Sequence, residues 1–410
     1  MNNNDRKYIV LLGDGMADHP IEALGGKTIL EHAHIPNMDY LASKGITGIT
    51  STVPKGMSPG SDTANLSIFG YDPALNYTGR APLEAISMGI NLGADDVAFR
   101  CNIVNAAGSI MEDFTASHID SALSEIVIRA ISRGITDADI EFYPGVSYRN
   151  LMVWRNYPYS SIAETTPPHD IQGENTEKYL PSGDGSSRLK ELMQKALIII
   201  ADSEEIKKGA EKLQGNPESI WLWGGGKKPA IETLESRFGL HGYTISAVDL
   251  IHGIGVAAGL EPYYVEGATG YIDTNYEGKA SALISLIKEC NYVFLHVESP
   301  DESGHEGSLE KKIESIEDFD KKIVGPVTRA MEGEYSRFSI LLMPDHHTPI
   351  SLKTHTDDPV PFSIYSRGGE LENEKRGKAA AYCEKTAEDT GLYIPAAHRL
   401  IEIMIKDSLD

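Results

Sequence analysis

The chain has 410 residues, 41% hydrophobic and 24% charged, so it is long enough for two domains and has the composition of an ordinary globular protein. Its formal net charge of -23 at pH 7 argues against nucleic-acid binding, because a phosphate polymer would be repelled. A small phosphorylated substrate would need bound cations to offset the same field. Three scattered cysteines, an N-terminus without a signal-peptide pattern and the lack of a membrane-spanning apolar run predict a cytoplasmic protein that binds no membrane.

The first part of the chain alternates strands and helices. Residues 7–13 predict a buried strand that closes on Asp14, and residues 35–44 predict a helix whose start is marked by Pro36. A short strand over residues 46–52 follows, and then a loop and a helix that reach about residue 74. This alternation predicts an α/β domain with a mostly parallel sheet.

From Asn76 onward the pattern changes, and it returns to the first pattern near residue 241. The elements expected in between are strands over 91–112, joined by a hairpin turn at 105–108, a helix over 119–132, strands over 140–143 and 147–155, helices over 189–213 and a strand over 219–223. We therefore predict a domain made of residues 1–74 and 240–410 that is split by an inserted α/β domain, residues 75–239.

Two later apolar strands run directly into acids and histidines. Residues 292–297 precede the segment PDESGHEG, and residues 339–343 precede the segment PDHHTP. Strands of this kind end at one edge of a parallel sheet, where α/β proteins place their chemistry. Together with the run KTH at residues 353–355, the segments supply donors suited to divalent cations, namely Asp301, His305, Asp345, His346 and His355. Any single one could be an ordinary surface group, but five together favour a site for two cations.

Two segments near the start of the chain add to this chemistry. Asp14, flanked by glycines at the end of the first strand, is placed to be a further metal ligand. Ser61 stands in a turn that opens a helix. A helix N-terminus and a nearby cation would both stabilise a serine alkoxide and the phosphate that it attacks. Alternatively, Ser61 or Asp62 is simply a helix cap.

Eight long blocks occur in order between about Tyr8 and Phe362: LLGDGMAD, PGSDTANLSIFGYDP, TGRAPLEA, ISAVDLIHGIG, GATGYIDTNYEGKA, HVESPDESGHEG, MPDHHTP and KTHTDDPVPF. In these blocks the chain resembles the archaeal-type, cofactor-independent phosphoglycerate mutases of the alkaline phosphatase superfamily. The resemblance implies an alkaline-phosphatase-like, doubly wound and mostly parallel sheet. It also implies interconversion of 3-phosphoglycerate and 2-phosphoglycerate through a phosphoserine at Ser61, with two divalent metal ions.

The resemblance implies how the ligands divide. One ion is expected at Asp301, His305 and His355. The ligands expected at the other ion are Asp14, Ser61, Asp345 and His346. Two neighbouring cations can stabilise both the attacking oxygen and the phosphoryl oxygens of an in-line displacement. Mn²⁺ is the first expectation, with Zn²⁺, Mg²⁺ and Co²⁺ as alternatives.

Other histidines and acids near these segments have less specific expectations. His347, which follows His346, is expected to have a supporting or structural role. His296, in the middle of a strand, is expected to be a core histidine. Asp357 and Asp358 could support neighbouring histidines, but solvated loop acids are commoner.

The inserted domain is expected to bind an acid-bearing substrate. His118 and Asp170 are candidate acid/base residues for a substrate hydroxyl. Arg149, His169 and Lys227 are candidate substrate-binding residues, because an arginine, or a lysine beside glycine-rich backbone, suits a carboxylate or phosphate. Each of the five could equally be an ordinary surface or interdomain group.

Other functions stay open at this point. The first is a phosphotransferase of the same fold that acts on another small hydroxyl acceptor, such as homoserine; the segment Gly224–Lys228 lacks an arginine where a carboxylate clamp is expected. The second is phosphatase or sulfatase hydrolysis, which the large inserted domain disfavours. The third is a non-catalytic protein, which is disfavoured because buried charges are costly to keep without a metal.

Overall fold

The computed structural model describes residues 6–106 and 108–409 and forms two compact units. Unit 1 comprises residues 1–77 and 231–410, and unit 2 comprises residues 78–230. The expected inserted domain, 75–239, was therefore too long at both ends. Tyr77 belongs to unit 1, where its hydroxyl donates to Asp62 Oδ2 at 2.5 Å. Helix α9 (Leu234–Phe238) also belongs there, because Leu234 is buried and its amide donates to the Ala258 carbonyl at 2.8 Å.

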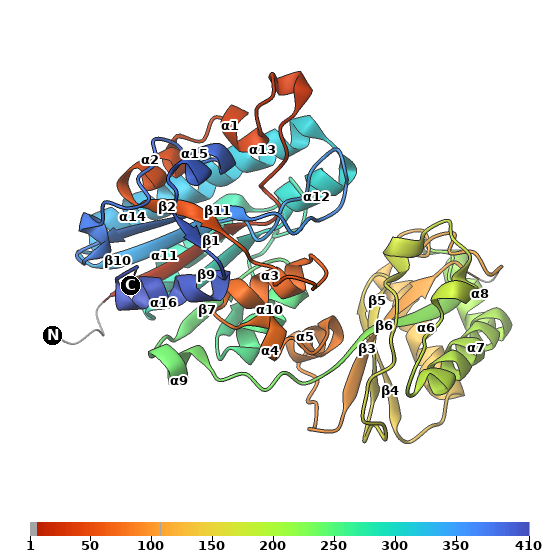
Figure 1. The fold of residues 1–410 in the computed structure, drawn as a ribbon. Coiled ribbons are helices and arrows are strands. Elements are labelled where there is room, and N and C mark those ends of the chain that lie inside the picture. Colours follow the sequence, from red (N-terminus) through yellow and green to blue (C-terminus); the bar gives the residue numbers. More distant parts are fainter. Residues whose placement is uncertain (1–5, 107, 410) are drawn as a thin grey trace. The chain divides into compact units, whose positions relative to one another are not determined.

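Unit 1 is built on an eight-stranded sheet with the order β12-β2-β11-β10-β1-β9-β7-β8 (Figure 1). The strands are β1 (Lys7–Gly13), β2 (Ile46–Thr50), β7 (Gly242–Ile245), β8 (Glu261–Tyr263), β9 (Tyr292–Val297), β10 (Phe338–Met343), β11 (Val360–Arg367) and β12 (Tyr393–Ile394). Strand β11 is antiparallel to both of its neighbours, and the other pairs are parallel. Strands β9 and β10 are buried along their whole length, which explains their uninterrupted apolar sequences. The predicted mostly parallel sheet is confirmed.

Helices cover both faces of this sheet (Figure 1). On one face, Ile9, Val293 and Ile340 pack in a single core with residues of α2 (Pro36–Lys44), α11 (Tyr276–Leu286), α13 (Leu309–Phe319) and α14 (Gly325–Glu334). On the other face lie α3 (Ser61–Ile68), α10 (Asp249–Ala257) and α16 (Leu400–Lys406). Here Phe69, at the end of α3, stacks on Phe294 of β9 with ring centroids 4.1 Å apart. The doubly wound arrangement is thus confirmed, and α3 is anchored to the sheet.

Unit 2 contains a four-stranded antiparallel sheet with the order β4-β5-β3-β6. Its strands are β3 (Val97–Val104), β4 (Ile140–Val146), β5 (Arg149–Trp154) and β6 (Ser219–Lys227). One face carries α6 (Ser121–Gly134), α7 (Ser186–Asp202) and α8 (Glu204–Ala210), and the other carries α5 (Arg80–Ser87). The hairpin expected over residues 91–112 was wrong, because β3 pairs with β5 and β6; residue 107 of its turn lies outside the described residues.

No helix within residues 6–106 and 108–409 has the length and apolar character needed to cross a membrane.

Candidate active site

The topology of unit 1 brings the ends of three strands together. Strand β1 lies between β9 and β10 and is parallel to both, so the three carboxyl ends share one edge of the sheet. Asp14 follows β1, Asp301 lies in helix α12 (Ser299–Glu306) directly after β9, and Asp345 and His346 follow β10. Residues far apart in sequence therefore gather where α/β sheets place their chemistry.

Asp301, His305 and His355 form one cluster. His305 Nε2 lies 2.9 Å from His355 Nε2 and 3.2 Å from Asp301 Oδ2, and His355 Nε2 lies 3.4 Å from Asp301 Oδ1. Asp301 and His305 are one helical turn apart in α12, which places their side chains on one face. His305 Nδ1 lies 3.0 Å from the Lys353 carbonyl, so Nδ1 donates to that carbonyl and Nε2 is the ring nitrogen that faces the cluster.

His346 is the centre of the second cluster. Its Nε2 lies 3.2 Å from Ser61 Oγ, 3.4 Å from Asp14 Oδ1 and 3.3 Å from Asp345 Oδ2. Asp14, Asp345 and His346 are fully buried, whereas Ser61 is half-buried. Asp14 Oδ1 has no hydrogen-bond donor among the described residues. A buried carboxylate oxygen without a donor is costly, and a cation would satisfy it.

Ser61 is the first residue of α3 and is not its cap. Gly60 occupies the cap position, and Asp62, the second residue of the helix, accepts from the Thr63 amide at 2.8 Å. Ser61 Oγ instead faces His346. The hydroxyl thus stands at a helix N-terminus, whose unpaired amides and dipole favour negative charge.

Burial and mutual repulsion shift the pKa values of the acids. Desolvation, reinforced by Asp345 and Glu298, raises the pKa of Asp14 well above its usual range. Desolvation also raises the pKa of Asp345 to about 6 and that of Glu298 to about 8. Although burial acts to raise it, the neighbouring imidazoles hold the pKa of Asp301 well below its usual range. Bound divalent cations would relieve the repulsion, so this set of carboxylates and imidazoles fits such ions.

Two polar residues that support the clusters were not predicted from the sequence. Thr348 Oγ1 donates to Asp301 Oδ1 at 2.5 Å and lies 3.2 Å from His346 Nδ1, so it links the two clusters. Asn65 Nδ2 donates to Asp345 Oδ2 at 2.8 Å. Asn65 lies four residues after the candidate nucleophile on α3, and this helical spacing was the available signal.

His296 is buried in β9, as expected for a core histidine, but it contacts the site. Its Nε2 lies 2.8 Å from Asp14 Oδ2 and 3.4 Å from Glu298 Oε2. Its Nδ1 lies 3.1 Å from Ser246 Oγ. His296 therefore fixes the orientation of the Asp14 carboxylate.

Unit 2 brings some of its candidates together around Trp223. The Arg100 guanidinium lies 4.5 Å from the centre of the Trp223 ring, and the His169 ring lies edge-on at 5.4 Å. Asp170 Oδ1 is 3.7 Å from His169 Nε2. Arg149 begins β5 opposite Asn102 of β3, and its guanidinium lies 4.5 Å from the centre of the Tyr148 ring. A basic and aromatic group therefore forms from β3, β6 and the segment at His169, and Arg149 lies on the strand next to β3.

The other two candidates of unit 2 have different surroundings. The backbone of His118 is left-handed, with φ of 51°, and its amide donates to Thr115 Oγ1 at 3.0 Å. Lys227 Nζ lies 3.5 Å from Asp95 Oδ1. The contact of His118 lies within its own turn, and the contact of Lys227 lies at the end of β6. Among the described residues, neither of these two is hydrogen-bonded or ion-paired to the group around Trp223.

Arg100 and Glu84 were missed by the sequence analysis. Glu84 Oε1 accepts from Arg80 Nε at 3.0 Å, and its Oε2 lies 2.9 Å from Arg100 Nε, although without the angle of a hydrogen bond. Burial acts to raise the pKa of Glu84, but Arg100 and Arg80 hold it below its ordinary value. Burial also lowers the pKa of Arg100 to about 10. Arg100 is a charged residue within the otherwise largely apolar strand Val97–Val104, and this position could have marked it as a candidate from the sequence.

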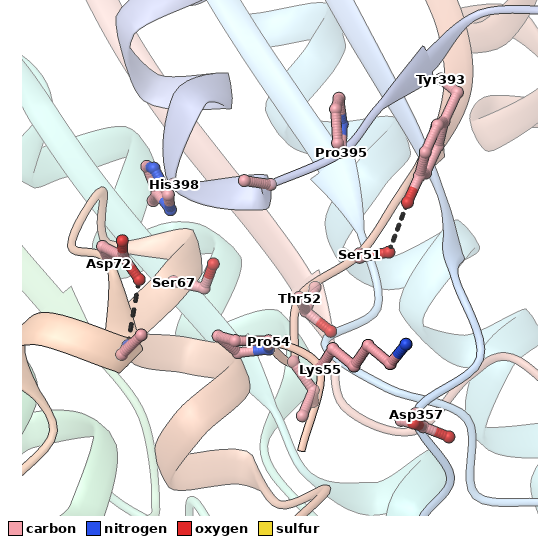
Figure 2. Close-up of a pocket in the computed structure, with 13 residues that line it drawn as sticks. Ser51, Thr52, Pro54, Lys55, Ser67, Asp72, Asp357, Tyr393, Pro395 and His398 are labelled. Carbon is pink, nitrogen blue, oxygen red and sulfur yellow. Dashed lines mark hydrogen bonds between the residues drawn. The ribbon is translucent and has the colours of Figure 1, made fainter. Parts of the chain in front are cut away.

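A cavity of about 490 Å³ lies elsewhere in unit 1 (Figure 2). Its lining includes Lys55 from the segment after β2, Ser67 from α3, Asp357 from the loop before β11 and His398 from the segment after β12. None of the lining residues is Ser61 or a predicted metal ligand. The cavity and the two clusters are therefore lined by different residues.

Comparison with known proteins identifies the family. Residues 42–205 match the family model described as 2,3-bisphosphoglycerate-independent phosphoglycerate mutase. A probable mutase of this type from Geobacter sulfurreducens is 49% identical over 403 residues, which cover 97% of this chain and 99% of the relative. A mutase of this type from Methanosarcina acetivorans is 51% identical, covering 88% of this chain and 90% of the relative. A solved structure of a Pyrococcus horikoshii protein has a TM-score of 0.80 and 29% identity, and covers 98% of this chain and 97% of that chain. The chain therefore belongs to the 2,3-bisphosphoglycerate-independent phosphoglycerate mutase family, as the resemblance of its sequence blocks implied.

Proposed function

We propose that this protein interconverts 3-phosphoglycerate and 2-phosphoglycerate without a bisphosphoglycerate cofactor, as the names of its relatives indicate. One observation carries the proposal beyond those names. Ser61 Oγ, at the N-terminus of α3, lies 3.2 Å from His346, at the centre of a buried cluster of acids and histidines. This arrangement suits a serine that accepts a phosphoryl group.

We further propose that two divalent ions bind at the clusters. One would be held by Asp301, His305 and His355. The residues that would hold the other are Asp14, Ser61, Asp345 and His346. The bound ions would supply positive charge that stabilises the serine alkoxide and the phosphoryl oxygens. Mn²⁺ is our first choice, with Zn²⁺ or Co²⁺ next, because imidazole ligands suit these ions better than Mg²⁺.

In the reaction that we propose, Ser61 loses its hydroxyl proton, and its Oγ attacks the phosphorus of the bound phosphoglycerate. The bond between phosphorus and the glycerate oxygen breaks, and that oxygen takes a proton to become a hydroxyl. The glycerate turns within the site, and its other hydroxyl loses a proton and attacks the phosphoserine. The bond between phosphorus and Ser61 Oγ breaks, and Ser61 regains its proton. The α3 N-terminus favours the negative charge that develops on Oγ. Asp170, beside His169, and His118 are the candidates for moving the glycerate protons.

The most direct test is turnover of 3-phosphoglycerate. Protein loaded with Mn²⁺ is expected to produce 2-phosphoglycerate in an enolase-coupled assay from which bisphosphoglycerate is omitted. Protein that is stripped with EDTA and freed of the chelator before the assay should not turn over 3-phosphoglycerate, and reloading it with Mn²⁺ should restore turnover, because the proposed reaction needs ions at the two clusters. Protein that holds two ions per chain and does not turn over would contradict the proposal. Phosphate release would instead indicate a phosphatase, and phosphorylation of homoserine with ATP would indicate the alternative transferase.

We propose that Arg149 and Arg100 bind the carboxylate of the glycerate, with His169 and Lys227 as further candidates. Arg149 is exposed at the start of β5 and is available to a ligand. Arg100, on the strand next to β6, would provide the arginine that the glycine-rich segment of β6 lacks. Glu84 holds Arg100 in place through their ion pair. An arginine–carboxylate pair is short, charge-assisted and geometrically specific.

Replacing Arg149 with methionine is expected to raise KM for 3-phosphoglycerate by about 10-fold to 100-fold, the equivalent of one charged hydrogen bond. The change in kcat should be smaller, because the substituted residue binds the acid group and not the transferred phosphate. Steady-state kinetics would measure both values. Arg129→Met is the matched control, since Arg129 is exposed on α6 and pairs with Glu125. A KM that Arg149→Met leaves equal to that of Arg129→Met would contradict the assignment.

A further inference from the structure

A third group of histidine and carboxylate side chains lies in unit 1 and has no role in the proposed reaction. His19 stands in the loop after β1, His347 follows β10, and Asp358 precedes β11. One ring nitrogen of each histidine and one carboxylate oxygen of Asp358 lie within 4.8 Å of one another. His19 Nε2 and Asp358 Oδ2 are 2.9 Å apart.

The hydrogen bonds of His347 leave one of its ring nitrogens ready to bind an ion. His347 Nε2 lies 3.1 Å from the Pro359 carbonyl, which can only accept, so Nε2 carries the proton and Nδ1 carries the lone pair. His347 is 6% exposed, and Nδ1 has no partner among the described residues. Metal-binding histidines are held in this way, with one nitrogen donating to a backbone carbonyl and the other free. An unsatisfied buried acceptor is otherwise a cost.

The surrounding backbone and side chains hold the group in place. His347 forms isolated bridges with Met16, Ala17 and Thr356, which bring the three segments side by side. Thr356 Oγ1 donates to Asp358 Oδ2 at 2.7 Å and so orients that carboxylate. Metal-ligating carboxylates are commonly hydrogen-bonded in this way.

We propose that His19, His347 and Asp358 bind a third divalent transition metal, for which Zn²⁺ is the best match. Two imidazoles and one carboxylate are a ligand set suited to such an ion, with open positions left for water. Ligand atoms that each lie about 2 Å from a tetrahedral ion are about 3 Å apart, which agrees with the separation of His19 Nε2 and Asp358 Oδ2. The ion would tie the loop after β1 to the segment that carries His355. This proposal does not depend on the reaction that the protein catalyses.

The test is the zinc content of wild-type protein and matched variants. Each protein is stripped with a chelator, dialysed against Zn²⁺ and then against metal-free buffer, and its zinc per chain is measured by elemental mass spectrometry. His19→Ala and Asp358→Asn are each expected to hold one equivalent less than wild type. Both side chains are partly exposed, so the fold should persist, which circular dichroism would check. His34→Ala, which removes another exposed histidine of unit 1, should hold as much zinc as wild type.

The test compares the zinc per chain of wild type and variants, so it does not depend on how much zinc the other two clusters hold. A loss of one equivalent in both variants, but not in His34→Ala, supports the third site. Equal zinc in wild type, His19→Ala and Asp358→Asn would show that His19 and Asp358 form only an ion pair, and the proposal would fail. Because activity is not the readout, failure of the mutase assignment would leave this result unchanged.

Discussion

Ser61→Ala is expected to lower kcat for 3-phosphoglycerate by at least about 10⁴-fold, since loss of a nucleophile removes the covalent route altogether. Ser61 stands at the first position of α3, and its Oγ lies 3.2 Å from His346 Nε2. Alanine is a good helix former, so α3 should be retained. Turnover would be measured in the enolase-coupled assay, and phosphorylation of the protein would be followed by intact mass.

Ser67→Ala is the matched control, because Ser67 is the other serine of α3 and lies near the end of the same helix. It should keep most of the activity. Metal content must also be measured for Ser61→Ala, since Ser61 is itself a proposed ligand. A variant that retained full turnover would exclude Ser61 as the nucleophile. A variant that lost turnover only because it lost both ions would show that Ser61 acts as a ligand and not as the nucleophile.

The positions of the clustered residues followed from the sequence because parallel strands place their carboxyl ends together. Apolar runs that end in Asp14, Asp301 and Asp345 therefore implied that these acids are neighbours. His355 lies farther along the loop after β10; its run KTH indicated a candidate donor, and the family resemblance supplied the ion to which it was assigned. Strand direction alone predicted that these acids share one edge of the sheet, so the conformation of the loops did not have to be known.

Contacts that depend on loop paths or on side-chain direction could not be predicted in this way. Thr348 links both clusters only because the segment after β10 turns back across the site. His347 was expected to have a supporting or structural role, and its unpartnered Nδ1 becomes visible only with the Pro359 carbonyl in place. The boundary near residue 231 was also missed, because α9 belongs to unit 1 through the packing of Leu234 and not through any change in composition.

In unit 2 the pairing and register of the strands identified Arg100 as a candidate binding residue, which the glycine-rich motif of β6 did not indicate. The glycine-rich segment drew attention to Lys227, which pairs with Asp95. The register of the antiparallel sheet instead places Arg100 opposite Trp223, and the buried Glu84 fixes its position. Strands β3 and β6 are distant in sequence but adjacent in the sheet. The buried Arg100 of β3 can therefore complete a binding site that the sequence suggested only for β6.

Asp301→Asn is expected to have the second large effect, a fall in kcat/KM of at least about 10³-fold together with loss of one bound ion per chain. Asp301 is 3% exposed and contacts Thr348, His305 and His355. Asparagine keeps the shape of the side chain but removes the charge that two imidazoles face. The carboxylate is the one anionic ligand of its cluster, so the affinity for a divalent cation should fall most at that cluster.

The metal-free protein offers a second readout for Asp301→Asn that does not involve catalysis. Although burial acts to lower it, the hydrogen bond to Asp301 raises the pKa of His305 to about 9. In Asp301→Asn the pKa of His305 should therefore fall, which NMR titration of the imidazole would measure. Glu306→Gln, on the same helix, removes only an exposed pair with Lys311 and should leave that pKa, the metal content and kcat/KM near the wild-type values. If the pKa of His305 fell while the metal content stayed at wild type, Asp301 would be a charge partner of His305 and not a metal ligand.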